Sequence, residues 1–69
     1  MKFDWEDGFA ISVRTEEGVA LISANREGLI SLANHLLKLA DGVPGEHFHL
    51  DRYNSLEDGS DELIIEKKE

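Results

Sequence analysis

The stretch that most constrains this chain runs from Asn25 to Gly42, where apolar residues recur at the spacing of an α-helix. They occupy positions i, i+3, i+4, i+7, i+8 and i+11 and so form one stripe along one helical face. The stripe consists of Leu29, Leu32, Ala33, Leu36, Leu37 and Ala40. Asn25 is a suitable N-cap, Pro44 prevents continuation, and His35 falls on the opposite, polar side. We therefore expect an amphipathic surface helix over about residues 26–41 that covers a core, with His35 in solvent.

Four other segments have the pattern of β-strands. The predicted strands span residues 9–15, 19–24, 46–51 and 61–67. Three of them alternate apolar and polar residues, whereas 19–24 is apolar almost throughout and is expected to be a central, largely buried strand. Phe3 and Trp5 predict a short strand or an arm packed inward. Because one helix covers one face of a sheet, we expect an α+β two-layer sandwich, β-β-α-β-β, with the helix on a four-stranded, mainly antiparallel sheet.

Length and composition set the class of protein. The 69 residues allow one small domain, with a frayed polar end at about 67–69. There is no cysteine, hence no disulfide and no thiol nucleophile. The N-terminus is acidic and lacks the apolar core of a signal peptide, and no apolar run reaches the roughly 18 residues of a membrane span. A cytoplasmic protein is expected.

The formal net charge is −8, and residues 46–69 carry eight acids against three bases. Such a field repels phosphate backbones and anionic membranes, so neither nucleic acid nor a membrane is an expected partner. A basic protein is the partner that it favours. The alternative is that the acidity simply keeps a small protein soluble.

A single helix leaves the second face of the predicted sheet uncovered. Its candidate residues are Ala10, Ser12, Arg14, Ala20, Ile22, Ala24, His47, His49, Asp51, Glu62, Ile64 and Glu66. The mixture of small, acidic and histidine side chains is typical of a binding surface. We predict partner contacts at His47, His49, Asp51, Glu62 and Glu66. Trp5 is a further candidate anchor, with a place in the core as the alternative.

The motif His47-Phe48-His49 is the sharpest local signal. In a strand its two imidazoles share a face about 6.5–7 Å apart, and Asp51 continues the row. Imidazoles with a carboxylate suit zinc, iron or nickel, but a structural site needs a fourth ligand, which only Glu62, Glu66 or another chain could provide. A solvated polar face is the commoner explanation, so no metal or cofactor is predicted, and a site at His47, His49 and Asp51 remains the alternative.

Catalysis is not predicted. The serines lack a nucleophile-elbow context, and the Gly-containing loop at 42–45 lacks the lysine and following helix of a phosphate-binding loop. A two-layer domain of this size also has little depth for a substrate cleft.

The chain resembles immunity protein family 32 of bacterial polymorphic toxin systems over about residues 28–67. The matching stretches are GLISLANHLLKLADG, PGEHFHLD and YNSLEDGSDELIIEK, and His47, His49 and Asp51 match the family pattern best. The resemblance implies an α+β protein that binds and neutralises a co-produced toxin and needs no catalytic residues. The charge favours a basic toxin such as a nuclease. Two alternatives remain open: a homodimeric structural or regulatory module that uses the open sheet face, and a small His-based metal-binding protein.

Overall fold

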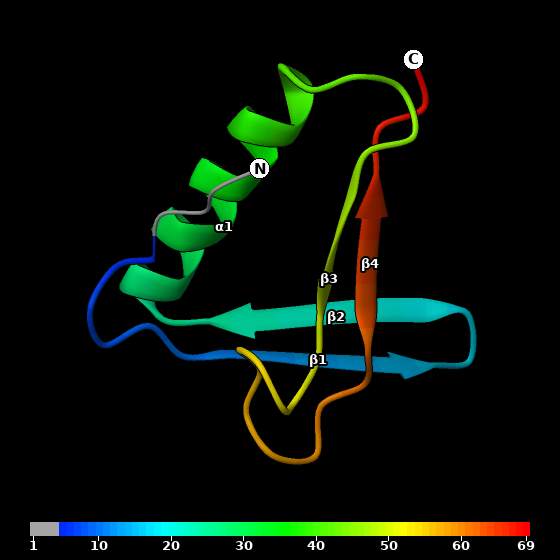
Figure 1. The fold of residues 1–69 in the computed structure, drawn as a ribbon. Coiled ribbons are helices and arrows are strands. Elements are labelled where there is room, and N and C mark those ends of the chain that lie inside the picture. Colours follow the sequence, from blue (N-terminus) through cyan, green and yellow to red (C-terminus); the bar gives the residue numbers. More distant parts are fainter. Residues whose placement is uncertain (1–4) are drawn as a thin grey trace.

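The computed structural model describes residues 5–69. Its elements are β1 (Ile11–Glu16), β2 (Val19–Ala24), α1 (Arg26–Ala40), β3 (His47–Leu50) and β4 (Leu63–Glu66) (Figure 1). The predicted α+β class and element order are confirmed, and the helix is one residue shorter than expected. Phe3 lies outside the described residues, and Trp5 belongs to no strand. Helix α1 is too short and too polar to cross a membrane, and it is the only helix between residues 5 and 69.

The predicted four-stranded sheet is wrong. The strands form two separate antiparallel hairpins, β1–β2 and β3–β4, which cross in Figure 1. The outer edge of β1 is already occupied by the connection between β3 and β4. There the N–H of Glu57 donates to the carbonyl of Ile11 (2.9 Å), and the N–H of Asp61 donates to that of Val13 (2.8 Å). Because these groups satisfy the edge of β1, neither β3 nor β4 can join its sheet.

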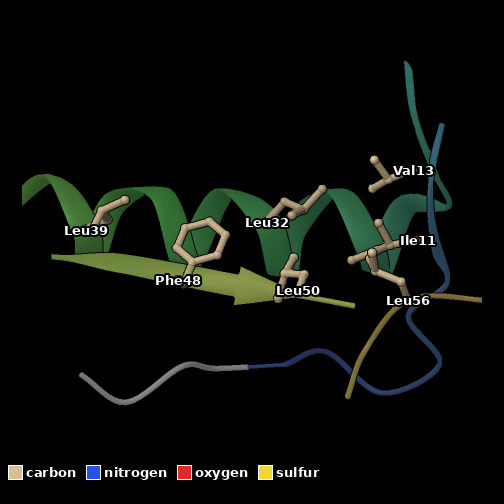
Figure 2. Packing of buried hydrophobic residues seen from close by; sticks show 7 residues of the cluster. All are labelled: Ile11, Val13, Leu32, Leu39, Phe48, Leu50 and Leu56. Atoms are coloured by element: carbon tan, nitrogen blue, oxygen red, sulfur yellow. The ribbon is translucent and has the colours of Figure 1, made fainter. Parts of the chain in front are cut away.

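The core lies where α1, β3 and β1 meet. Figure 2 shows α1 lying along β3, with β1 passing across the end of the helix at which Ile11 is found. The buried hydrophobic residues are Ile11, Val13, Leu32, Leu39, Phe48, Leu50 and Leu56. The helix therefore does cover a core, as predicted.

The helix uses a different face from the predicted one. Its buried residues are Gly28, Ser31, Leu32, His35 and Leu39. Of the predicted stripe, Leu36 is 46% exposed and Leu37 is 68% exposed, whereas Leu32 is buried. The cause lies at the helix start: a Cβ on Gly28 would lie 2.6 Å from the carbonyl oxygen of Ala10. This close approach turns the small residues of the helix toward β1 and turns part of the leucine stripe outward.

Strand β2 is not the buried central strand that its apolar sequence predicts. All of its residues except the half-buried Ala24 are exposed, and its strand partner is β1. Val19 is 64% exposed and Leu21 is 55% exposed. The apolar sequence predicted burial, but no other strand within residues 5–69 reaches the second edge of β2.

The two ends of α1 are capped. The side chain of Asn25 accepts from the N–H of Gly28 (2.8 Å), as predicted for an N-cap. At the other end, Lys67 Nζ donates to the carbonyls of Ala40 (2.7 Å) and Gly42 (2.6 Å). Lys67, where the frayed tail was expected to begin, thus holds the last turn of the helix against the end of β4.

Candidate functional site

The candidate site is the outer face of the β3–β4 hairpin. The register pairs His47 with Glu66 and His49 with Ile64, so these side chains share one face. The alternate residues Phe48 and Leu50 point into the core. The outer face therefore consists of His47, His49, Asp51, Glu62, Ile64 and Glu66. This arrangement agrees with the side-chain alternation inferred from the sequence.

His49 and Glu62 are in direct contact on this face. The His49 Nε2 atom lies 2.9 Å from a carboxylate oxygen of Glu62, and both side chains are about half exposed. Asp51 completes a group in which one ligand atom from each of the three residues lies within 4.8 Å of the others. Chemically, the group presents one imidazole and two carboxylates to the same point.

Asp51 is held in place by the turn that follows β3. Its Oδ1 atom accepts from the N–H of Tyr53 (2.9 Å) and of Asn54 (3.0 Å). The side chain of Asn54 in turn accepts from the N–H of Asp51 (3.0 Å) and donates to the carbonyl of His49 (3.0 Å). These bonds place one carboxylate oxygen of Asp51 on the backbone and restrict the position of the other.

The two histidines are not equivalent. Among the described residues, the three-membered group includes His49 but not His47. The Nδ1 atom of His47 lies 3.4 Å from the carbonyl oxygen of Gly45, at the start of the strand. The ligand set His47, His49 and Asp51 considered from the sequence is therefore replaced in the structure by His49, Asp51 and Glu62. Glu62 lies opposite Asp51, and its long side chain reaches His49 diagonally across the hairpin.

Trp5 lies apart from the other candidate residues. Its ring stacks on Phe9 with centroids 4.4 Å apart and contacts the ring of His35 at 4.2 Å. His35 in turn contacts Phe48 at 5.5 Å, on the inner face of the β3–β4 hairpin. Trp5 and the outer-face carboxylates are thus on opposite sides of that hairpin.

His35 is the residue whose predicted position differs most from its position in the structure. It is fully buried among aromatic rings, and its Nδ1 atom is paired with the carbonyl oxygen of Ser31. The prediction that it faces solvent is wrong. The available signal was the row of small residues one and two turns before it, Gly28 and Ser31, which marks where other elements approach the helix.

Asp61 is close to the site in the sequence, but its side chain stabilises the fold. Its carboxylate accepts from the N–H (2.7 Å) and the hydroxyl (3.1 Å) of Thr15 on β1. These two hydrogen bonds, the backbone one first, hold the pKa of Asp61 below its ordinary value of 3.8. Asp61 is therefore a fixed anchor between the β3–β4 connection and β1.

Comparison with known protein families gives a match over most of the chain. The family model described as immunity protein 32 matches residues 20–68, which include α1, β3, β4 and the whole outer face of the β3–β4 hairpin. Searches of curated proteins and of solved structures gave no significant match.

Proposed function

The chain belongs to the immunity protein 32 family, and on this premise we propose that it neutralises a cognate bacterial toxin by binding and occluding it. We assign the contact to the outer face of the β3–β4 hairpin and take the toxin to be a basic protein such as a nuclease. The proposed action is stoichiometric binding in the cytoplasm of the producing cell. It needs no catalytic residue, cofactor, nucleic acid or membrane.

The observation that carries this proposal is the composition of the outer face. The exposed side chain of Ile64 lies between Glu62 and Glu66 along β4 and opposite His49 on β3. An apolar centre surrounded by charged side chains is the usual anatomy of a protein interface. The carboxylates would meet lysines and arginines of the toxin, where they would stand in for the phosphates of a nucleic-acid substrate.

A growth-protection assay tests the assignment. Cells that express the toxin encoded beside this chain should survive with the natural chain and die with the double variant Glu62→Lys/Glu66→Lys. Glu6→Lys/Glu57→Lys makes the same change in net charge at two exposed residues outside this face and serves as the control. If both double variants lose protection equally, overall net charge and not this face determines protection. If neither variant loses protection, this face is not the contact with the toxin.

The association rate gives a second measurement. Electrostatic steering raises association rates by about 10–10³-fold, and salt screens it. We expect the natural chain to bind the toxin more slowly as ionic strength rises, and Glu62→Lys/Glu66→Lys to remove most of that dependence. A rate that does not change with salt would refute the charge complementarity while leaving toxin binding itself intact.

Metal binding is a second candidate function, favoured by the convergence of His49, Asp51 and Glu62 within 4.8 Å. One imidazole and two carboxylates can hold a divalent ion such as Zn²⁺ together with water. In a zinc titration, His49→Ala should abolish binding, whereas His47→Ala should leave it unchanged. Equal loss in both variants would contradict this ligand set, and no binding to the natural chain at micromolar zinc would exclude the function.

A further inference from the structure

Strand β2 has a backbone edge that no other described segment covers. The N–H of Asn25 donates to the carbonyl of Ala10 across the hairpin. Because backbone groups two residues apart point to the same side of a strand, Val19, Leu21 and Ser23 direct theirs toward β1. Ala20, Ile22 and Ala24 therefore direct theirs away from β1. No backbone hydrogen bond joins these outward groups to another strand or loop within residues 5–69.

The free edge also lacks the features that normally prevent strands from pairing between molecules. Such edges are usually protected by charges, proline, bulges or a covering segment. Strand β2 is six residues long and has no charged residue or proline, and Val19 and Leu21 expose most of their side chains. By contrast, the outer edge of β1 is covered by the connection at Glu57–Asp61, and β4 is four residues long and carries Glu66.

Net charge restricts which part of the surface can form a contact between two copies. Two molecules that each carry −8 repel each other, so a contact between copies is least costly at an uncharged surface. Strand β2 is such a surface. A two-stranded sheet is also marginal by itself, whereas pairing of two β2 edges would produce a continuous four-stranded sheet.

Side-chain pairing selects the register of an antiparallel β2–β2 contact. Of the symmetric registers that bring the outward backbone groups together, the two with most overlap have Leu21 opposite itself or Ile22 opposite itself. The first places Leu21 opposite Leu21 and Ala20 opposite Ile22, and the paired stretch ends at Ala24, before α1 begins. The second places Leu21 opposite Ser23 and Val19 opposite Asn25, the residue that caps α1. Apolar pairs in the first register and apolar–polar pairs in the second favour the contact centred on Leu21.

We propose that the chain forms a symmetric homodimer in which the two β2 strands pair antiparallel, with Leu21 opposite Leu21 of the second copy. The outer faces of both β3–β4 hairpins stay outside this contact. The dimer is therefore independent of toxin binding, and an experiment can refute either proposal while the other stands.

Cysteine cross-linking tests the register, because the natural chain has no cysteine. In the proposed pairing the two residues 21 form a pair without mutual hydrogen bonds, with Cα atoms about 4.5 Å apart, which permits a disulfide. Under mild oxidation with diamide, which accepts the two electrons and two protons of the thiols, Leu21→Cys should give a covalent dimer. Val19→Cys should not, because its two copies would lie about 14 Å apart, four residues along the strand.

Sedimentation of the unmodified chain tests the dimer itself. We expect a dimer that Leu21→Glu converts to a monomer, with the dissociation constant raised on the order of 100-fold, since two buried leucines are replaced by two facing carboxylates. Leu37→Glu places the same side chain at an exposed position of α1 and should leave the dimer intact.

A natural chain that sediments as a monomer at high micromolar concentration would overturn the proposal. A dimer in which Leu21→Cys and Val19→Cys cross-link equally, or neither does, would overturn the β2 contact. If the chain is a monomer but Leu21→Glu abolishes toxin protection, the edge receives a strand of the toxin instead of a second copy.

Discussion

Leu32 and Leu36 belong to the same apolar stripe in the sequence, yet the structure predicts different consequences for their replacement by alanine. Leu32 is 7% exposed and lies in the core cluster, whereas Leu36 is 46% exposed. Both lie inside α1, where alanine is a slightly better helix former than leucine. The pair therefore isolates the effect of burial from that of helix propensity.

The expected costs follow from burial. Replacing a buried leucine by alanine costs about 2–5 kcal/mol, because transfer free energy is lost and a cavity remains. For Leu36 about half of the transfer term is already absent and water can fill the space, so we expect a cost of about 1 kcal/mol or less. A small domain has about 3–5 kcal/mol of stability in total. Leu32→Ala should therefore leave it close to unfolding, and Leu36→Ala should not.

Urea denaturation measures this difference. Far-UV circular dichroism reports the loss of α1, and Trp5 fluorescence reports the loss of its contact with His35. The free energy of unfolding of each variant is obtained by linear extrapolation to zero urea. We expect the two variants to differ by at least about 1 kcal/mol. Equal costs would show that Leu36 packs as deeply as Leu32 and would refute the helix orientation described above.

Three further predictions follow from specific contacts. Gly28→Ala should destabilise the protein by about 1–3 kcal/mol despite the better helix propensity of alanine, since the new Cβ would meet the carbonyl oxygen of Ala10 at 2.6 Å; thermal unfolding measures this. Asn25→Ala should lower the free energy of unfolding by about 1–2 kcal/mol, because the side-chain oxygen of Asn25 accepts from the N–H groups of both Gly28 and Ala10; urea denaturation measures this. Carbon-13 NMR titration should give Asp61 a pKa below 3.8, and Thr15→Val should raise that pKa part of the way, since the backbone donor remains. Because the folded-state pKa is depressed, the stability from Asp61 is present above pH 3.8 and is lost as the pH falls through the folded-state pKa.

Each of these predictions has a control. A stabilisation of about 1 kcal/mol in Gly28→Ala would show that propensity outweighs the contact and that the helix start has room. Asn25→Asp retains the acceptor for the N–H groups of Gly28 and Ala10 but loses the amide donor to the carbonyl of Gly8 (2.9 Å), so it should recover part of the loss seen in Asn25→Ala. No recovery would contradict the capping role. Asp61→Asn removes the titrating carboxylate, so the loss of folding stability as the pH falls below 3.8 should become smaller. An unchanged loss would exclude the hydrogen bonds of Asp61 to Thr15 as its cause.

Much of the candidate site was predictable because it depends on alternation within one hairpin. Side chains two residues apart share a face, so His47, His49 and Asp51 had to lie together wherever 47–50 formed a strand. Glu62 and Glu66 joined them because β4 (Leu63–Glu66), which directly follows Glu62, pairs antiparallel with β3. The particular contact of His49 with Glu62 depends on register, which is set by the connection at residues 51–62 and not by either strand alone.

The sequence by itself determined the α+β class, the order and approximate bounds of the elements, the cap at Asn25 and the family, because all of these depend on neighbours along the chain. The tertiary structure decided what each apolar surface contacts. An apolar residue type favours burial but does not specify which part of the molecule it contacts. The pattern therefore could not distinguish the buried Leu32 from the exposed Leu36, and it could not place β2 at an edge rather than in the centre of a sheet. Those outcomes depended on the close approach at Gly28 and on the β3–β4 connection taking the edge of β1. Both are contacts between residues distant in the sequence, and they left the apolar side chains of β2 exposed.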